Sequence, residues 1–499
     1  MIELRPDGLA ADEVVRIARG LEHVALGSEA RQAMAASRAI VDRLAASETP
    51  VYGVSTGFGA MATRYVEPEQ RRLLQASVVR SHAAGMGAPV EREVVRALIL
   101  LRARTLAMGH SGVRPVVAER MCELLNADRL PEVPEFGSLG CSGDLAPLSH
   151  VALALLGEAD VAAADGSRSR VEAPIVLEEK EGLALINGTD GMLGMLLLAC
   201  ADLRCLLASA DITAALSIEA LLGTDQAFRP ELIALRPHPG QRASAANLMR
   251  MLAGSGIVAS HREGDARVQD AYSMRCAPQV HGAALDALAF VETVCERELA
   301  SAIDNPVVLP NGSVASNGNF HGAPLAYAAD FLAIPAADVA SIAERRTDRL
   351  LDPARSHGLP AFLAHDPGID SGLMIAQYTQ AGVVSELKRL AVPASVDSIP
   401  SSAMQEDHVS MGWSSCRKLR RSVDGLAKVL AVELVAGARG VALRAPLAPA
   451  PATAAACELV AGPGPDRPLA AELAAAELVV ASGALLRAVV AVVGPLESA

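Results

Sequence analysis

Aromatic side chains are scarce in this chain: phenylalanine, tyrosine and tryptophan together supply 3% of its 499 residues, with a single tryptophan. Alanine, leucine and valine dominate its hydrophobic half instead. Alanine and leucine are strong helix formers, whereas aromatic residues are typical of strands. The composition therefore argues against a β-sandwich and predicts packed helices around a large core.

Paired metal-ligand motifs are also missing from the sequence. No two of the eight cysteines have the spacing Cys-x-x-Cys, and the eleven histidines show no metalloprotease spacing. This argues against a zinc framework and a disulfide scaffold, and it predicts buried thiols in a reducing compartment. The sequence has no basic cluster against its net charge of -13, so we expect no nucleic-acid partner.

A secretory leader is not expected, since residues 1–20 contain early acidic residues and no apolar core. The segment most like a membrane span is residues 478–496, where Arg487 is the only charge and lies near the middle. A charge at that depth costs about 2.5–3.5 kcal/mol in a bilayer, so a buried helix rich in alanine and valine is the better interpretation. We therefore predict a cytoplasmic protein without a membrane partner.

Several long apolar segments have helical spacing. Residues 192–222 are apolar on nearly every side, which is typical of a helix buried inside a bundle. Apolar residues within 285–299 and within 426–434 recur on one helical face. We therefore predict a mainly α-helical fold, with an N-terminal region over residues 1–190 that carries the reactive loops and a helical bundle over residues 191–499.

One stretch, GSLGCSGDLAPL at residues 137–148, surrounds the triplet Cys141-Ser142-Gly143 with further glycine. Gly140 and Gly143 permit a backbone bend that residues with a Cβ resist. Such a bend can bring the amide nitrogen of Gly143 onto the carbonyl carbon of Cys141. Loss of water, including the Ser142 hydroxyl, would then leave an electrophilic imidazolone ring with an exocyclic methylene. Taken alone, Cys-Ser-Gly is better interpreted as an ordinary turn, and the surrounding sequence reverses this in favour of the reactive interpretation.

A second glycine-rich stretch, VYGVSTGFGA at residues 51–60, presents Tyr52. Its Gly-Phe-Gly element invites interpretation as a dinucleotide-binding loop. That motif requires a helix directly afterwards, whereas residues 61–69 contain Pro68 and show no apolar helical stripe. A flexible loop that presents Tyr52 fits better, so no nucleotide is expected.

Further blocks complete a pattern that runs from residue 52 to about residue 413. They are SHAAG at 81–85, INGT at 186–189, VQDAYSMRCAPQ at 268–279, GNFHG at 318–322, SIP at 398–400 and QEDHVSM at 405–411. Together with the two glycine-rich stretches they resemble the family of aromatic amino acid ammonia-lyases and aminomutases, most of all its histidine ammonia-lyase branch. The usual triplet of that family is Ala-Ser-Gly, and Cys141 is a variant that keeps the reacting serine and glycine.

The resemblance implies a fold, a prosthetic group and an assembly. The fold is the long-helix bundle of the fumarase/aspartase-like type. The group is 4-methylidene-imidazol-5-one (MIO), formed autocatalytically from Cys141-Ser142-Gly143, with no metal, pyridoxal phosphate or nucleotide. The substrate is a small aromatic amino acid. Relatives are homotetramers whose active sites draw residues from three chains, so the resemblance implies a homotetramer with shared active sites here.

The resemblance also implies roles for individual residues. Tyr52 corresponds to the base that removes the β-proton, and its pKa must be lowered for work near neutral pH. Arg275 is implied to hold the substrate carboxylate through two parallel hydrogen bonds, which lysine could not copy. The other implied contacts are Asn187 and Tyr272 with the amine and the MIO carbonyl, Gln269 with the carboxylate or the electrophile, Phe320 as a pocket wall, and His82 and Glu406 with an imidazole ring.

Each of these residues has a purely structural interpretation when taken alone. Tyr52 could be a packed tyrosine, and Arg275 a surface cation. Asn187-Gly188 is a common turn pair, and residues 406–408 could be a solvated polar run. Their joint order along the chain is what favours catalysis.

Two departures from the usual histidine-lyase pattern leave the substrate open. Asp190 stands where glutamine is usual after Asn-Gly-Thr, and Met404 replaces an asparagine two residues before Glu406. We expect elimination of ammonia from L-histidine to give trans-urocanate. The alternative is a 2,3-aminomutase, or a lyase, acting on histidine, tyrosine or a related aromatic amino acid. A helical scaffold without catalysis is the least favoured interpretation.

Overall fold

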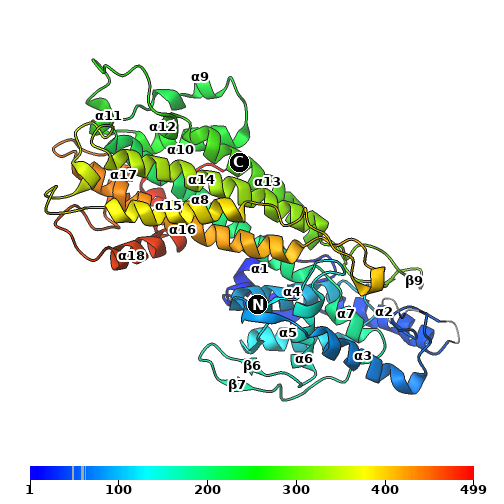
Figure 1. Cartoon of the computed structure of the whole chain (residues 1–499). Coiled ribbons are helices and arrows are strands. Elements are labelled where there is room, and N and C mark those ends of the chain that lie inside the picture. The colour runs from blue at the N-terminus through cyan, green and yellow to red at the C-terminus, as the bar shows by residue number, and fades with distance from the viewer. Residues whose placement is uncertain (48–49, 58–60, 62, 499) are drawn as a thin grey trace. The chain divides into compact units, whose positions relative to one another are not determined.

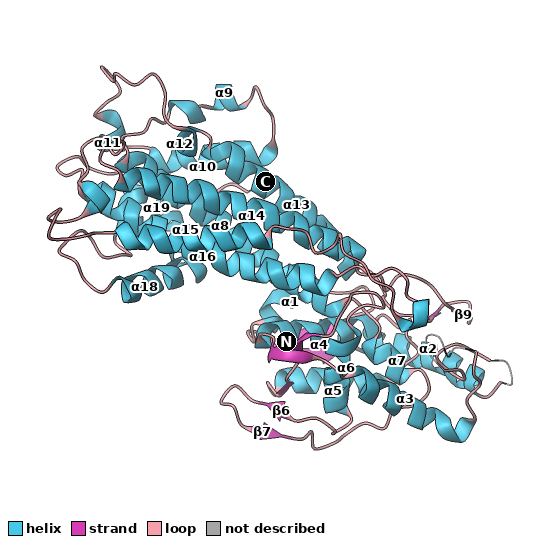
Figure 2. Cartoon of the chain, in the orientation of Figure 1, coloured by secondary structure: helices cyan, strands magenta, loops and turns pink. Residues whose placement is uncertain are grey.

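The computed structural model describes residues 1–47, 50–57, 61 and 63–498, and helices dominate these residues (Figure 2). The predicted mainly α-helical fold is confirmed. Two compact units are present: unit 1 comprises Met1–Leu198, Glu292–Asp330 and Pro393–Arg417, and unit 2 comprises Ala199–Val291, Phe331–Val392 and Lys418–Ala499. The predicted boundary between residues 190 and 191 stays a prediction.

Unit 1 contains the shorter helices of the N-terminal part of the chain (Figure 1). They are α1 (Ala11–Ala18), α2 (Ser28–Ala45), α3 (Pro68–His82), α4 (Arg92–Ala107), α5 (Pro115–Asn126), α6 (Leu145–Leu155) and α7 (Glu181–Ile186). Four longer helices contribute residues to both units: α8 (Asp190–Ala220), α13 (Ala277–Leu299), α14 (Ala323–Leu351) and α16 (Gly412–Ala442).

The strands are short, and all belong to unit 1. Strand β1 (Ile2–Leu4) pairs in parallel with β2 (Val24–Leu26), with Ile2 opposite Val24. The antiparallel pairs are β3 (Met86–Pro89) with β5 (Pro134–Phe136), β4 (Leu130–Pro131) with β6 (Val161–Ala162), β6 with β7 (Arg168–Ser169), and β8 (Val307–Val308) with β9 (Val314–Ala315). Strand β5 ends at Phe136, so its pairing with β3 fixes the start of the stretch at residues 137–148.

Helix α4 is the core of unit 1, and it is buried continuously from Val94 to Ala107 although it carries arginines. Helices α1 and α5 pack against it. Arg96 donates to the carbonyl oxygens of Ile17 and Leu125, which lie in the last turns of those two helices, at 2.9–3.0 Å. Because a guanidinium group carries five donors in a plane, one buried arginine can satisfy the free carbonyls at several helix ends.

Unit 2 is a helical bundle in which buried polar side chains join the helices. Its own helices are α9 (Pro230–Ile233), α10 (Pro239–Leu252), α11 (Gly256–Ala259), α12 (Tyr272–Arg275), α15 (Met374–Leu390), α17 (Pro451–Cys457), α18 (Leu469–Ala481) and α19 (Ala484–Val493). Glu433 of α16 pairs with Arg346 of α14, and both are fully buried. Thr213 and Ser217 of α8 also donate to this carboxylate, at 2.7 and 2.9 Å. These bonds offset the cost of burying the charge.

Short 3₁₀ turns complete the secondary structure of the described residues. They span Gln226–Phe228, Ala361–Leu363 and Ser402–Met404. The last of these lies in unit 1, immediately before Glu406.

Helices α8 and α14 are long and apolar enough to cross a membrane by length and composition alone. Most of the apolar window of each is buried inside the chain, 72% for α8 and 61% for α14. The buried carboxylate of Asp211 on α8 has partners, because His281 Nδ1 lies 2.8 Å from it and Ser244 donates to it at 2.6 Å. Packing within the chain therefore accounts for the apolar composition of these helices.

The C-terminal apolar segment forms two helices where the sequence suggested one. Helix α18 ends at Ala481 and α19 begins at Ala484, with a bend of 59° between them. Gly483 has φ +72°, a left-handed conformation that favours glycine. Arg487 donates to the carbonyl oxygen of Ser482 at 2.9 Å, so this charge helps to close the end of α18.

The Arg346–Glu433 pair gives a test of the bundle. Replacing Arg346 with Met should lower the free energy of unfolding by about 3–5 kcal/mol, because the Glu433 carboxylate then stays buried without its cation. The double variant Arg346→Met with Glu433→Leu should recover most of that loss, since no buried charge remains. Thermal unfolding followed by circular dichroism measures both.

A matched control uses an exposed ion pair on α15. Arg389 lies 2.8 Å from Glu386 at the surface, so Arg389→Met should cost less than about 1 kcal/mol. A double Arg346/Glu433 variant as unstable as Arg346→Met alone would contradict the assignment of the loss to an unpaired buried carboxylate.

Candidate active site

The Cys141-Ser142-Gly143 triplet lies in a loop whose backbone is held from both sides. Gly143 has φ +78°, and a Cβ there would collide with the carbonyl oxygen of Gly188. That oxygen accepts from the amide of Asp144 at 2.7 Å, which fixes the loop against the segment ahead of α8. The left-handed backbone and the close approach both require glycine at position 143.

Gly140, with φ +65°, closes the other side of the loop. Its carbonyl oxygen accepts from the Ser410 hydroxyl at 2.8 Å and from the Gly322 amide at 3.0 Å. Three segments that are far apart in sequence therefore meet at this bend. They are the loop itself, the GNFHG block and the QEDHVSM block of the sequence pattern.

Asp144 joins the loop to α8 through a buried carboxyl group. Its Oδ2 accepts from the amides of Gly191 and Met192 at 2.9 Å each, and its Oδ1 accepts from the Ser138 hydroxyl at 2.8 Å. Those two amides belong to the first turn of α8, where helix N–H groups lack partners within the helix. Complete burial raises the pKa of Asp144 to about 7, although the three hydrogen bonds favour the carboxylate.

Glu406 places a carboxylate directly on the triplet. Ser142 Oγ lies 3.2 Å from Glu406 Oε1, and Cys141 Sγ lies 3.2 Å from Oε2. Ser401 also donates to Oε2, at 2.9 Å. Burial, together with this carboxylate, raises the pKa of the Cys141 thiol to about 12, so the thiol keeps its proton at neutral pH.

Asn187 lies at the end of α7, almost fully buried, with one polar atom left over. Its Nδ2 donates to the carbonyl oxygen of Asn305 at 2.9 Å, and its own carbonyl accepts from Arg102 of α4 at 2.7 Å. Its side-chain Oδ1 has no hydrogen-bond partner among the described residues. A buried acceptor without a partner is costly in a folded protein, and a substrate ammonium group would satisfy it.

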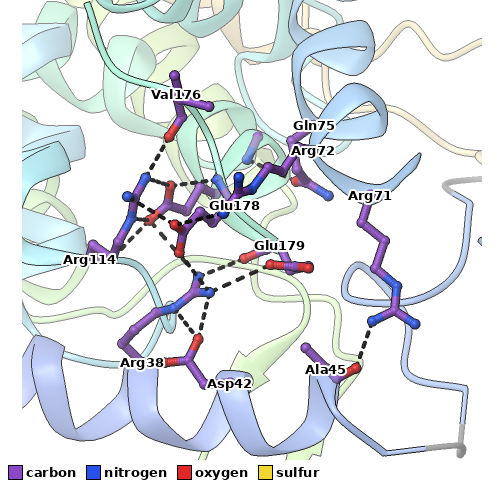
Figure 3. A network of polar contacts seen from close by, with 12 residues as sticks. Arg38, Asp42, Ala45, Arg71, Arg72, Gln75, Arg114, Val176, Glu178 and Glu179 are labelled. Atoms are coloured by element: carbon purple, nitrogen blue, oxygen red, sulfur yellow. Dashed lines mark hydrogen bonds and ion pairs between the residues drawn. The ribbon is translucent and has the colours of Figure 1, made fainter. Parts of the chain in front are cut away.

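A polar network holds the segment that leads into α7 (Figure 3). Arg38 of α2 donates to the carbonyl oxygen of Glu179 at 2.8 Å and contacts the Glu178 carboxylate at 3.4 Å. Arg114, just before α5, makes a two-pronged ion pair with buried Glu181. The network joins α2, α5 and α7, and it thereby fixes the position of Asn187.

The Tyr52 loop is described as far as residue 57, and residues 58–60 of the predicted stretch lie outside the described residues. Tyr52 itself is half-buried. A Cβ on the neighbouring Gly53, with φ +76°, would lie 3.2 Å from Leu183 of α7 and 3.1 Å from Pro306. The loop therefore rests on the same structure that carries Asn187. Beneath it, Lys180 and Asp304 form a fully buried ion pair at 2.6 Å.

Arg71 of α3 stabilises the far end of this loop. It donates to the carbonyl oxygens of Ala45 and Val66 at 2.6 and 3.1 Å and to the Tyr65 hydroxyl at 3.0 Å. Figure 3 shows its guanidinium group beside Ala45, at the end of α2. One buried cation thus holds the chain on both sides of the Tyr52 loop.

Two further residues of unit 1 that were predicted to contact the substrate are more exposed than Asn187. His82 is the last residue of α3, and its Nδ1 lies 3.0 Å from the Ser81 hydroxyl. Phe320 is half-buried in the loop between β9 and α14, two residues before Gly322, which bonds to the triplet loop. The structure therefore attaches the Phe320 loop to the triplet through the backbone.

Unit 2 carries the remaining predicted residues as a cluster of their own. Arg275 donates to the Gln269 side chain at 2.7 Å, and its guanidinium carbon lies 4.5 Å from the centre of the Tyr272 ring. Tyr272 is 71% exposed. The stacked ring and the amide leave other guanidinium donors available for a carboxylate.

Two residues that depart from the usual family pattern have different surroundings. Asp190 is buried at the start of α8, where its Oδ2 lies 3.4 Å from Arg102 and its Oδ1 accepts from Thr105 at 3.3 Å. The Asp190 carboxylate therefore has a cationic partner, which is the same Arg102 that donates to the backbone carbonyl of Asn187. Met404, in contrast, is 68% exposed within unit 1.

Sequence reasoning gave no role to Asp144, Arg102 or Glu298. Thr189 donates to Glu298 at 2.6 Å, which adds a second, half-buried acid close to Asn187. The sequence of α4 did indicate buried polar contacts, because arginines within an otherwise apolar helix need buried partners. Residue spacing could not show which residues those partners are. Among the described residues, no group of three or more His, Cys, Asp or Glu side chains is arranged to hold a metal ion.

A mainly helical fold, a glycine-bent Cys-Ser-Gly loop and a carboxylate on that loop agree with the predicted class of protein, a carbon–nitrogen lyase. The sequence matches the family described as aromatic amino acid lyase over residues 9–461. The chain belongs to the aromatic amino acid lyase family. The prediction of a carbon–nitrogen lyase is thereby confirmed.

Similar proteins include histidine ammonia-lyases over nearly the whole chain. The one from Streptomyces avermitilis is 62% identical over 502 residues, and the one from Streptomyces griseus is 63% identical over 504 residues; each comparison covers 98% of both chains. Among solved structures, a tyrosine aminomutase from Streptomyces globisporus matches with TM-score 0.93 at 36% identity, covering 100% of both chains. The histidine ammonia-lyase of Trypanosoma cruzi matches with TM-score 0.90 at 36% identity, covering 98% of this chain and 94% of that one.

The raised pKa of Asp144 predicts a pH dependence of stability. Its folded pKa of about 7 lies above its ordinary value of 3.8, so between these values the folded protein holds a proton that the unfolded chain releases. The stabilisation from this proton is complete below the ordinary value and is lost as pH rises to about 7. Within that window it falls by up to about 1.4 kcal/mol per pH unit.

The comparison of Asp144→Asn with its parent measures this effect. Both proteins should carry Ser142→Ala, so that ring formation does not differ between them. As the pH is raised from about 5 to 7, the parent should lose stability relative to the Asn variant, which has no group to titrate. A difference in thermal midpoint that stays constant across this range would contradict the assignment.

Proposed function

We propose that this chain is a histidine ammonia-lyase, which eliminates ammonia from L-histidine to give trans-urocanate. The observation that carries the proposal is the Glu406 carboxylate, which lies 3.2 Å from both Ser142 and Cys141. A carboxylate at that place offers an acceptor for an imidazole N–H of a substrate whose amine reaches the triplet. Relatives named histidine ammonia-lyase at 62–63% identity support this substrate.

We propose further that Cys141-Ser142-Gly143 becomes the MIO group. The residues present fit it, because Gly143 has a left-handed backbone and no room for a Cβ. When formed, the group supplies an electrophile that captures the amine and makes it a better leaving group. The proposal uses no metal, pyridoxal phosphate or nucleotide.

The other predicted site residues of unit 1 have separate roles in this proposal. Asn187 Oδ1 accepts a hydrogen of the substrate amine, which explains its lack of a partner among the described residues. Tyr52, as tyrosinate, accepts the β-proton, which is weakly acidic and needs a base at a fixed distance. His82 meets the imidazole together with Glu406, and Phe320 forms a wall of the pocket.

Unit 2 supplies the contact with the substrate carboxylate in this proposal. Arg275 holds the carboxylate through two parallel hydrogen bonds, Gln269 orients its guanidinium group, and Tyr272 helps to orient the amine. The proposed assembly is a homotetramer in which each active site draws residues from more than one chain. The proposed location is the cytoplasm.

A second candidate is a 2,3-aminomutase that acts on histidine, tyrosine or a related aromatic amino acid. The observation that favours it is the likeness to tyrosine aminomutase at TM-score 0.93. Met404, in place of the usual asparagine, also changes the polarity of the segment that carries Glu406. The higher identity to histidine ammonia-lyases makes elimination from histidine the main proposal.

Ser142→Ala tests the proposed function, because alanine has no hydroxyl to lose and the exocyclic methylene cannot form. Turnover of L-histidine, followed by urocanate absorbance, should fall by at least about 10³-fold, while circular dichroism stays that of the parent. Ser169→Ala, which removes an exposed hydroxyl on β7, is the control and should retain the activity of the parent. Unchanged turnover by Ser142→Ala would overturn the proposal.

A further inference from the structure

We propose that Glu406 also takes part in the maturation of the triplet, as the carboxylate that carries the Cα proton of Ser142 to the hydroxyl of the same residue when that hydroxyl leaves. This inference rests on the proposed function, because only a chain that forms the MIO group needs this step. It gives Glu406 a task in the chain's own chemistry, before any substrate binds.

The geometry around Glu406 separates its two oxygens. Oε2 accepts from Ser401 at 2.9 Å and from the Cys141 thiol at 3.2 Å. Oε1 lies 3.2 Å from Ser142 Oγ. The backbone of Glu406 is fixed as well, because it exchanges two hydrogen bonds with the backbone of Ser401 at 2.7 and 3.2 Å. One oxygen is therefore held by two donors, and the other is directed at the hydroxyl that has to depart.

Asp144, the acid next to the triplet in sequence, is less suited to this step. Its oxygens already accept from Ser138, Gly191 and Met192 within a completely buried site. Those bonds hold the loop on α8. Glu406 is half-buried and its Oε1 lies in contact with the Ser142 hydroxyl, so it can pass a proton to the departing group.

The step balances as two losses of water. First, the Gly143 nitrogen bonds to the Cys141 carbonyl carbon, and the carbonyl oxygen leaves as water with the amide hydrogens of Ser142 and Gly143. Second, the Glu406 carboxylate removes the Cα proton of Ser142, and the electron pair of that Cα–H bond forms the Cα=Cβ bond as the Cβ–Oγ bond breaks with its electron pair on oxygen. Glu406 passes the proton to the departing oxygen, which leaves as water, and Glu406 is a carboxylate again.

Cys141 acts in this scheme as a positioning residue. Its thiol donates to Oε2 and so helps to turn Oε1 toward Ser142. The usual alanine of the family has no such donor. Cys141→Ala should therefore slow the second loss of water by a few-fold, because Ser401 still holds Oε2.

The experiment is intact-protein mass spectrometry of the full chain at intervals after a pulse of synthesis. The wild-type chain should lose two water molecules. Glu406→Gln keeps the shape and a hydrogen-bonding group but cannot carry the proton from Cα to the departing oxygen. It should accumulate chain that has lost one water, with the second loss slowed on the order of 100-fold. Asp407→Asn, an exposed neighbour, is the control and should mature like the wild type.

Chemical rescue gives a second and independent arm. Glu406→Ala should stall at the same mass, and added formate should restore the second loss of water by supplying a carboxyl group in the vacated space. Folding is judged by circular dichroism against Ser142→Ala. If Glu406→Gln does not fold, the alanine variant decides: maturation at the wild-type rate without formate would overturn the proposal, as would a stall that formate does not relieve.

The readout separates this inference from the proposed function. A role for Glu406 in substrate binding alone predicts a Glu406→Gln chain that loses both waters at the wild-type rate and then turns over histidine poorly. That result overturns the inference and leaves the proposed function standing. Urocanate formation by Ser142→Ala would instead defeat the proposed function itself.

Discussion

The buried carboxyl group of Asp144 is the constraint on which the rest of the site depends. It accepts hydrogen bonds from two amides in the first turn of α8 and from one hydroxyl of the preceding loop, so the bent backbone is attached to a long buried helix. Gly143 lies against Gly188 with no space for a Cβ. A strained conformation persists when its surroundings determine it in several ways, and these contacts do so here.

The same packing brings two kinds of acceptor to this part of unit 1. Arg102 and the network around Glu181 fix Asn187 and leave its Oδ1 as a buried acceptor without a partner among the described residues. Glu406 brings a carboxylate to Ser142. A substrate with an ammonium group at one end and an imidazole at the other complements this arrangement of acceptors, and histidine has both groups.

Sequence predicted the helical class and the reactive triplet because both depend on local chemistry. Helical spacing of leucine and the need for glycine at position 143 can be read without knowing the fold. The contact between Ser142 and Glu406 joins residues 264 positions apart, and the hydrogen-bond partners of Arg102, which are Asn187 and Ile303, lie 85 and 201 positions from it. Such contacts, like the break at Gly483, are set by tertiary packing. The chemical roles of the site residues stay predictions.

The identity of the product tests the central claim most directly. The purified chain is incubated separately with L-histidine, L-tyrosine and L-phenylalanine, and the products are followed by mass and by ultraviolet absorbance. The account predicts a product from histidine alone, lighter than the substrate by one ammonia and absorbing as urocanate. A β-amino acid of unchanged mass, or elimination from tyrosine or phenylalanine in preference to histidine, would contradict it.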